Sequence, residues 1–519
     1  MKYRESKTDK ELRDWFLADM TKGLLRKIQV AKGTMRGICT LDIDLTFPIT
    51  AFAGINGAGK STLLALACCA YHGKKDGFKL PRRKNSYYTF SDFFIQHKEE
   101  QAPDGIEINY HIAYNGWKKS EGLPDGIGIA YQTRHKNKGG KWNDYQTRVK
   151  KTVVFLGIER IVPHSERSQS RSYSRSFADS KPKGWENKVR EAVGFILGKK
   201  YDDFRYLEYS RYSLPIVKVG DITYSGFNMG AGENALFEIF STLYSCGKGA
   251  LLVMDEIELG LHAKAQKLFM TKLKEVCLEM GTQVICTTHS REIFECLPDD
   301  ARFFVETISG KTKLTPGISP EFAFAKMGAP GGKELDIFVE DNVAKSLLQA
   351  ILPAAVRTRV TIRVIGSASA VARQLAAHYV RKDDRSVVAI YDGDQRVKAG
   401  NNLDHAQKMA ENPRPDFVEW YQSHVSHLPG ETWPEAWIVQ KAAEVRDVTA
   451  VALSIEADAV PGIMEYGLQA GKHNEFYEIA QRVGLDKQQC LERLSATVCA
   501  AFRENFDPIV KFMLISTES

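Results

Sequence analysis

Residues 54–61 have the types and the spacing needed to hold a phosphate group, because they fit the pattern Gly-x-x-x-x-Gly-Lys-Ser/Thr. Glycines let backbone N–H groups close around a β-phosphate, the lysine reaches the β and γ phosphates, and the hydroxyl ligates Mg²⁺. The segment therefore predicts a site for ATP with Mg²⁺ on Ser61. The residues expected to contact the nucleotide are Gly54, Asn56, Gly57, Gly59, Lys60, Ser61 and Thr62.

The flanking residues provide the elements that such a loop requires. Residues 41–45 alternate in polarity like a half-buried strand, and residues 49–53 are apolar like a buried one. Residues 62–70 favour a helix. A loop between this strand and this helix would present the phosphate to the positive end of the helix. This context disfavours the alternative, a chance glycine-rich turn.

Two acids follow a second buried strand. Residues 249–254 are apolar and lead to Asp255 and Glu256, and the carboxyl ends of parallel strands are where α/β folds bind ligands. We expect Asp255 to hold Mg²⁺ and Glu256 to orient or deprotonate the attacking water. A helix is predicted from residue 259 to residue 279.

The next apolar strand, residues 283–288, leads to His289. A histidine considered alone is more often structural than catalytic. Its position one strand beyond the acid pair instead predicts a contact with the γ-phosphate.

A glycine-containing turn at residues 224–232 opens an amphipathic helix. The arrangement resembles the signature loop of ABC ATPases, which caps the γ-phosphate bound by a second subunit. The resemblance implies that Gly230, Gly232 and Glu233 contact nucleotide in a dimer that encloses two ATP molecules. Met229 stands where that family has serine, which implies slow or conditional hydrolysis.

These motifs follow the order of an ABC-type head over residues 25–305, which resembles the heads of RecF, structural-maintenance-of-chromosomes ATPases and OLD (overcoming lysogenization defect) nucleases. No long heptad repeat separates the loop from the acid pair, so coiled-coil arms are not expected. This disfavours a chromosome-structure or DNA-repair ATPase. Gln96 is the candidate for the glutamine that couples ATP binding to the rest of an ABC head, and an ordinary surface glutamine is equally compatible.

Composition limits the class of protein further. A chain of 519 residues exceeds one compact core, so two or three domains are expected. The nine cysteines include no CxxC pair, which favours reduced thiols. The absence of a long apolar run and of a signal peptide predicts a cytoplasmic protein with no membrane partner. A net charge of +7 permits nucleic-acid binding without requiring it.

Two insertions are rich in cations. Residues 133–151 suggest a basic hairpin, and residues 164–187 suggest a flexible loop rich in Ser and Arg. Either could follow a phosphate backbone. Solvated surface loops are the alternative.

Acids also follow apolar strands in the C-terminal half. Residues 335–339 lead to Glu340, and residues 386–391 lead to Asp392 and Asp394, with a further strand at residues 360–365 between them. Carboxylates suit Mg²⁺ and Mn²⁺, which can activate water for phosphodiester cleavage. A simple turn is the alternative for the second acid pair.

This order of strands, helices and acids resembles the Toprim fold, and an ABC head followed by a Toprim domain is the OLD arrangement. The resemblance implies that Glu340, Asp392 and Asp394 are catalytic metal ligands. Glu435 is a fourth candidate, with helix N-terminal charge as the alternative. Ala344 stands where relatives often carry a second acid, which Asp341 could replace.

The predicted fold is α/β. It comprises an ABC-type P-loop ATPase head at residues 1–310 with the two insertions, a linker at 311–333, a Toprim-like domain at 334–440 and a helical region at 441–519. The resemblance implies an ATP-gated nuclease acting on DNA or RNA in defence against phage, of the Gabija-like or retron-associated type.

The expected partners are a second copy in a homodimer or higher even oligomer, nucleic acid, and either a reverse transcriptase with its non-coding RNA/DNA or a separate effector protein. The alternative is a non-nuclease ATPase sensor, as in Septu or retron modules, that controls a separate effector.

Overall fold

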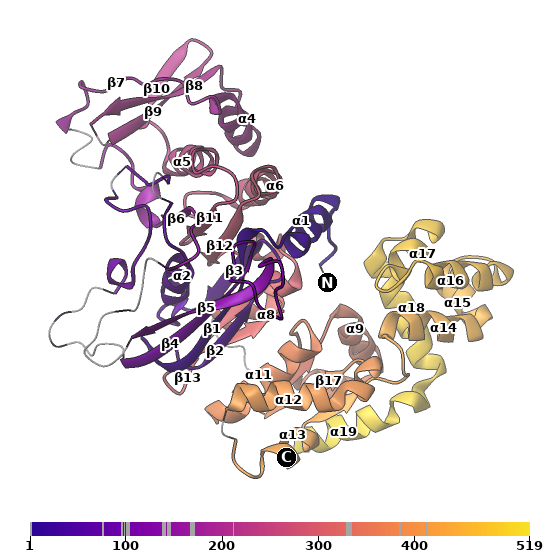
Figure 1. Cartoon of the computed structure of the whole chain (residues 1–519). Coiled ribbons are helices and arrows are strands. Elements are labelled where there is room, and N and C mark those ends of the chain that lie inside the picture. The colour runs from indigo at the N-terminus through magenta and orange to yellow at the C-terminus, as the bar shows by residue number, and fades with distance from the viewer. Residues whose placement is uncertain are drawn as a thin grey trace. The chain divides into compact units, whose positions relative to one another are not determined.

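The computed structural model divides the chain after Leu314 into an N-terminal unit, Tyr3–Leu314, and a C-terminal unit from Thr315 onward (Figure 1). The described residues are 3–74, 77–81, 83–94, 97, 99, 104–136, 142, 147–166, 172–210, 212–327, 335–382, 386–411 and 413–518.

A six-stranded sheet forms the centre of the N-terminal unit. Its order is β14 (Lys311–Pro316), β13 (Arg302–Ile308), β3 (Ile49–Gly54), β12 (Gln283–Thr288), β11 (Leu251–Met254) and β6 (Val153–Leu156). The strands from β13 to β6 are parallel. Every residue of β3, β11 and β12 is buried, as expected for parallel strands covered on both faces. The strand that leads into the phosphate loop and the strand that leads to the acid pair are therefore separated by β12.

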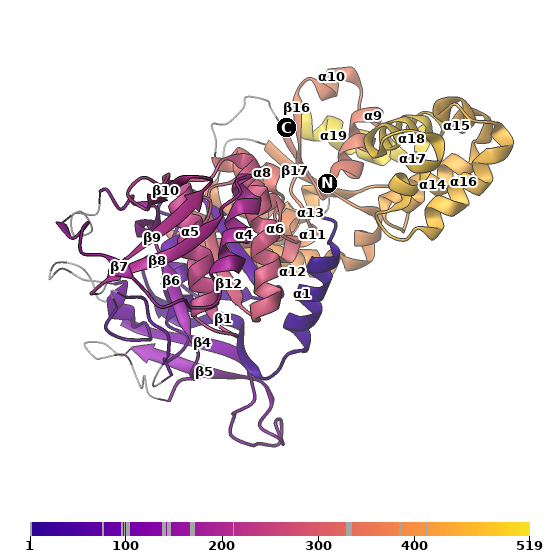
Figure 2. The ribbon, with the colours of Figure 1, turned by 90° about the horizontal axis from the view of Figure 1, so that it is seen from above.

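The N-terminal unit also contains two antiparallel sheets (Figure 2). One has the order β2 (Leu41–Asp44), β1 (Lys22–Thr34), β4 (Asp104–Tyr114) and β5 (Gly128–Lys136), and the other β10 (Ile222–Ser225), β9 (Tyr212–Val219), β8 (Asp203–Tyr209) and β7 (Ala178–Asp179). The first sheet is tied to the phosphate-loop helix because the Tyr110 hydroxyl donates to Leu66 O at 2.8 Å.

The helices of the N-terminal unit are α1 (Lys7–Ala18), α2 (Lys60–Cys68), α4 (Glu186–Leu197), α5 (Ala231–Ser245), α6 (Ala263–Met280) and α7 (Arg291–Glu295). Helix α6 begins four residues later than predicted. Gly260 has a positive φ, and His262 has extended backbone and caps the helix by accepting from Ala265 N at 3.3 Å. Residues 259–262 are consequently a loop.

The C-terminal unit contains a four-stranded parallel sheet. Its order is β16 (Val360–Val364), β15 (Leu335–Val339), β17 (Ser386–Tyr391) and β18 (Val425–His427). The helices along this part of the chain are α8 (Pro320–Met327), α9 (Asn342–Ile351), α10 (Ala354–Arg357), α11 (Ala368–Arg381), α12 (Ala399–Ala410) and α13 (Phe417–Ser423).

Helices follow to the end of the described chain: α14 (Pro434–Glu444), α15 (Arg446–Leu453), α16 (Val460–Gln469), α17 (Glu475–Val483), α18 (Lys487–Ala501) and α19 (Asp507–Glu518). They share a hydrophobic core with the parallel sheet. This core includes Ile337 of β15, Leu347 of α9 and Leu494 of α18. The core therefore continues across residue 440, where a domain boundary was predicted.

The predicted linker contains secondary structure. Helix α8 lies within residues 311–333, with Pro320 in its first turn and Ser319 Oγ accepting from Phe322 N at 3.2 Å. Proline and glycine suggest a linker in the sequence, but proline also favours the first position of a helix. Residues 328–334 lie outside the described residues.

The α/β fold class with a helical C-terminal region is confirmed. All nine cysteines are free thiols. Of the helices in the described part of the chain, none is long and apolar enough to cross a membrane.

A buried ion pair fastens α1 to α6. Asp9 and Lys274 are 2.6 Å apart, and both side chains are buried. The Asp9 carboxylate also accepts hydrogen bonds from Ser6 N and the Tyr3 hydroxyl. Burial alone would raise the pKa of Asp9, but the hydrogen bonds and the charge of Lys274 lower it below the usual value.

We predict that Asp9→Asn destabilises the N-terminal unit by about 3 kcal/mol in urea unfolding, because it leaves a buried ammonium without a counter-charge. The double variant Asp9→Asn/Lys274→Met should be more stable than the single one. Since the folded pKa is lowered, the contribution of Asp9 is complete above its unfolded pKa of about 3.9 and is lost as the pH falls through the folded value. Equal stability of wild type and Asp9→Asn at pH 7 would contradict this role.

Candidate functional site

Residues 54–60 form a tight loop between β3 and α2. Gly57 and Gly59 have φ of +78° and +103°, which favours glycine. A Cβ at Gly54 would lie 2.0 Å from Val305 O, and one at Gly59 would lie 2.8 Å from Thr312 Oγ1. At Gly57 a Cβ would meet nothing within 4 Å, so that side of the loop is open. The loop is thus packed against β13 and β14 on one side and open on the other.

The Lys60 side chain lies over this loop. Its Nζ donates to Gly54 O at 2.9 Å and to Ile55 O at 3.0 Å. Burial lowers the pKa of Lys60, and nearby carboxylates, Asp255 foremost, oppose that shift. The ammonium therefore lies within electrostatic reach of the acid pair.

The loop fits the triphosphate that the motif implies. Its open side, the N-terminus of α2 and a lysine that currently bonds to loop carbonyls are features of an anion site. Lys60 and the loop amides would hold phosphate oxygens, and Ser61, which is exposed, would hold Mg²⁺. Bound Mg²⁺ would supply charge neutralisation at the phosphates.

The acid pair is held at the end of β11 by the neighbouring strand. The Thr287 hydroxyl donates to Asp255 Oδ1 at 2.6 Å and accepts from Glu256 N at 2.7 Å. Glu256 has φ of +48°, an uncommon value for a residue other than glycine. Because Thr287 contacts both residues, it orients the Asp255 carboxylate and the backbone of Glu256 together.

Arg160 is a site residue that the sequence analysis missed. It lies in η2 (Ile158–Ile161), is 2% exposed, and donates to Asp255 O at 2.7 Å and to Glu256 O. Burial lowers its pKa, with Glu238 the leading opposing group, yet a guanidinium stays charged. It thus places a positive charge directly behind the acid pair. An arginine four residues after an apolar strand was the available signal.

Glu258 was missed as well. Its carboxylate accepts from the Thr288 hydroxyl at 2.7 Å and from His289 N at 2.5 Å. Glu258 therefore fixes the turn that carries His289, whose side chain is exposed. Since Thr288 pairs with Ala53, this turn lies at the same edge of the sheet as the phosphate loop. A third acid two residues after Glu256 was the signal for it.

The signature segment is built into the N-terminal unit at the start of α5. Gly230 caps the helix, and a Cβ on Gly232 would lie 2.0 Å from Gly260 O. The Glu233 carboxylate accepts from the hydroxyls of Tyr201 and Tyr224, so it has partners within its own unit. Its contact with nucleotide stays a prediction.

The C-terminal acids fall into two groups. Glu340 and Asp392 follow the adjacent strands β15 and β17, both are buried, and Asp392 N donates to Glu340 Oε1 at 3.2 Å. Asp394 instead lies 3.3 Å from Lys472. Glu435 Oε1 lies 2.6 Å from His473 Nδ1. The structure thus brings together the first two acids and gives each of the others a basic neighbour.

The four acids remain predicted metal ligands. Within the described ranges, no three His, Cys, Asp or Glu side chains form a group that could hold a metal ion. Asp341, the suggested replacement for an acid at position 344, uses Oδ1 to accept from Val343 N and Ala344 N as the cap of α9. Ala344 itself is fully buried.

The described part of the basic insertion at residues 133–151 has both buried and exposed basic residues, with His135 and Lys150 among the exposed ones. Arg134, Arg148 and Lys151 are each at most 3% exposed. Arg148 donates to backbone carbonyls of Cys69, Tyr71 and Tyr88, and Lys151 donates to Lys22 O. These three cations therefore stabilise the fold. Residues 137–141, 143–146 and 167–171 of the two insertions, and Gln96, lie outside the described residues.

We predict that Glu256→Gln retains ATP binding and lowers the rate of ATP hydrolysis about 100-fold or more, because the sequence motif assigns to this carboxylate the orientation of the attacking water. Nucleotide binding by fluorescence and phosphate release would measure the two effects. Glu275→Gln, at an exposed glutamate of α6, is the matched control and should hydrolyse ATP like the wild type. A Glu256→Gln rate within about twofold of wild type would exclude this role.

Comparison with family models gives two matches in the N-terminal unit. Residues 35–211 match a family described as "AAA domain", and residues 220–295 match one described as "AAA domain, putative AbiEii toxin, Type IV TA system". The first match contains the phosphate loop and Arg160, and the second contains the signature segment, the acid pair and His289. A comparison with curated proteins found no match.

Solved structures similar to this chain include heads of SMC proteins. They include the SMC head domain from Thermotoga maritima (14% identity, 56% of this chain and 98% of that chain, TM-score 0.34). An SMC head bound to the C-terminal winged-helix domain of ScpA is also similar (15%, 56% and 97%, 0.37). A third is the head from Pyrococcus furiosus bound to the C-terminal domain of ScpA (14%, 56% and 95%, 0.35). TM-scores this low do not establish a shared fold by themselves.

The family matches agree with the geometry of the site in the N-terminal unit. A glycine loop follows β3, an acid pair follows β11, and β12 orients that pair. The N-terminal unit contains a P-loop ATPase domain.

Proposed function

We propose that the chain is an ATP-dependent nuclease of the OLD type, in which ATP hydrolysis controls cleavage of nucleic acid at Glu340 and Asp392. The observation that carries this proposal is that two buried acids follow adjacent parallel strands, with the backbone N of Asp392 donating to Glu340 Oε1, in one chain with a P-loop ATPase domain. A role in defence against phage follows from the OLD resemblance, of the Gabija-like or retron-associated type.

The donor set at this contact suits a hard divalent cation. Carboxylate oxygens are the ligands that Mg²⁺ and Mn²⁺ prefer. A bound cation would supply Lewis-acid activation of water. Glu340 and Asp392 would hold it, while their burial excludes bulk water from the reacting phosphate.

Asp394 and Glu435 would join the site only after leaving their present neighbours. Lys472 and His473, which contact them, are consecutive residues after α16. A change in this one segment would therefore alter both acids at once. We propose that these pairs keep the site incomplete until nucleic acid or metal binds.

The active form is proposed to be a homodimer joined through the ATPase domains, or a higher even oligomer. The N-terminus of α5 supports this, because Gly230 is open on its Cβ side and could approach a nucleotide held by a second copy. Met229, which replaces the family's serine, is buried and cannot supply that serine's hydroxyl.

The same residues favour a second candidate function, a non-nuclease ATPase that senses infection and controls a separate effector, as in Septu or retron modules. Ala344 replaces an acid, Asp341 serves as a helix cap, and Asp394 and Glu435 have basic neighbours. The toxin–antitoxin description of the family matched by residues 220–295 is compatible with either candidate.

We predict that Asp392→Asn lowers metal-dependent cleavage of plasmid and single-stranded DNA and of RNA about 100-fold or more, with ATP hydrolysis unchanged, because only the metal-binding carboxylate is altered. Cleavage is measured with Mg²⁺ or Mn²⁺, with and without ATP. Asp404→Asn, at an exposed aspartate of α12, is the matched control and should cleave like the wild type. If the wild type cleaves no substrate under any of these conditions, the nuclease proposal fails and the sensor is favoured.

A further inference from the structure

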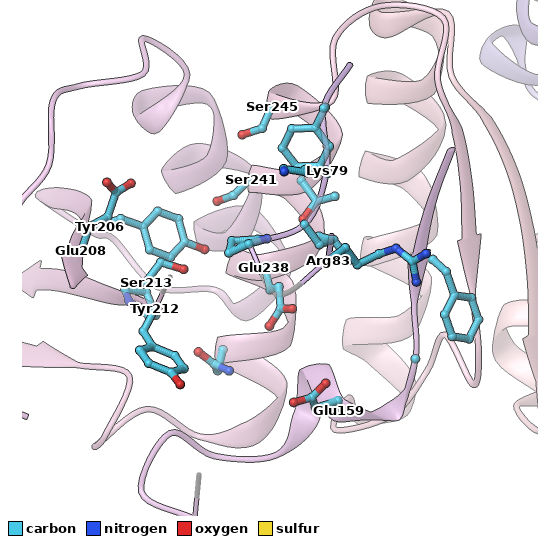
Figure 3. Close-up of a pocket in the computed structure, with 18 of the residues that line it drawn as sticks. Lys79, Arg83, Glu159, Tyr206, Glu208, Tyr212, Ser213, Glu238, Ser241 and Ser245 are labelled. Carbon is cyan, nitrogen blue, oxygen red and sulfur yellow. The ribbon is translucent and has the colours of Figure 1, made fainter. Parts of the chain in front are cut away.

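A cavity of about 610 Å³ lies in the N-terminal unit between α5, η2, β8 and β9 (Figure 3). None of residues 54–62 lines it, so it is distinct from the phosphate loop. Its volume falls within the range of pockets that bind small organic ligands. Its lining combines flat apolar walls with one polar side.

Aromatic rings form the walls. Phe155 lines the cavity from β6, Trp185 from the residue before α4, and Tyr206 and Tyr212 from β8 and β9. Such rings stack on flat ligands, and their offset or edge contacts favour an aromatic partner over an aliphatic one. The walls therefore fit a planar aromatic ring.

The polar side is a stripe along α5. Positions 234, 238, 241, 242 and 245 all line the cavity, and this spacing places them on one helix face. Figure 3 shows Glu238, Ser241 and Ser245 along this helix, with the rings of Tyr206 and Tyr212 beside them. The stripe offers hydroxyl, amide and carboxylate groups to the edge of a ring lying between the walls.

Ser241 indicates that this stripe is built for a ligand. The residue is 5% exposed, and its Oγ has no hydrogen-bond partner among the described residues. A buried hydroxyl without a partner is destabilising, and buried polar groups in proteins are normally paired. A ligand with a hydrogen-bonding edge would supply the missing partner.

The charges at the cavity favour an uncharged ligand. Lys183 lies 3.2 Å from Glu208, and both line the cavity. Arg83 lies 3.3 Å from Asp92 and stacks over the Tyr88 ring at 3.8 Å. The lining as a whole balances three cations, Lys79, Arg83 and Lys183, with three carboxylates, Glu159, Glu208 and Glu238, so it offers no net positive charge to a phosphate.

We propose that this cavity binds a neutral nucleoside, whose base stacks between the aromatic walls and hydrogen-bonds to Ser241, and that its occupancy changes the rate of ATP hydrolysis. The coupling follows from two shared elements. Helix α5 begins at the signature segment, and Asn234 Nδ2 donates to Arg160 O at 3.4 Å. Arg160 in turn donates to the carbonyl oxygens of Asp255 and Glu256.

The test is isothermal titration of the full chain with adenosine, guanosine, cytidine and uridine, followed by ATP hydrolysis with each nucleoside that binds. At least one nucleoside should bind and change the hydrolysis rate. Ser241→Ala should weaken its binding about 3- to 10-fold, the equivalent of one hydrogen bond, and should leave the unfolding temperature equal or higher. Tyr206→Ala should weaken it by a similar factor through lost stacking.

Two variants serve as controls. Ser495→Ala removes another buried hydroxyl, in the C-terminal unit, for which the described part of the chain provides no hydrogen-bond partner, and it should leave nucleoside binding unchanged. Lys60→Ala alters the phosphate loop and should leave it unchanged too. Absence of binding by all four nucleosides at millimolar concentration would overturn the proposal. So would binding that is lost in Lys60→Ala and retained in Ser241→Ala, because the nucleoside would then occupy the ATP site.

Discussion

The arrangement of the ATPase domain depends on holding two carboxylates together at the end of one buried strand. Carboxylates on consecutive residues repel each other, and positive or hydrogen-bonding groups nearby offset that repulsion. The fold meets this constraint with three groups from different parts of the chain. Thr287 bonds to both residues, Arg160 places its guanidinium on their carbonyl oxygens, and Lys60 lies within electrostatic reach. These contacts require β6, β11, β12 and β3 to lie in that order.

The same use of strand ends recurs in the C-terminal unit. Glu340 and Asp392 meet because β15 and β17 are adjacent and parallel, and Asp392 N donates to Glu340. The acids that follow them along the chain have basic neighbours instead.

The features that could be predicted from the sequence are those formed by residues close together in the chain. The strand, glycine loop and helix at residues 49–68 are contiguous, so their pattern was sufficient, and the acid pair follows its own strand. Arg160 and Glu258 were missed because their roles come from contacts with residues far away or across a turn. The cations Arg134, Arg148 and Lys151 suggested a surface, yet all three are buried. Arg148 and Lys151 donate to backbone carbonyls of other segments, and Arg134 donates to that of its neighbour Thr133. A linker was predicted where helix α8 lies, because proline and glycine are common in turns, yet proline also favours the first turn of a helix.

The most direct test of the central claim is release of phosphate from ATP and Mg²⁺ by the wild type and by Lys60→Ala, with Lys264→Ala, at an exposed lysine of α6, as the matched control. The expected result is hydrolysis by the wild type and the control, and a loss of about tenfold or more in Lys60→Ala, because the lysine of this motif is expected to hold the β and γ phosphates. Equal rates in all three proteins would contradict the assignment of the loop as the site of ATP hydrolysis.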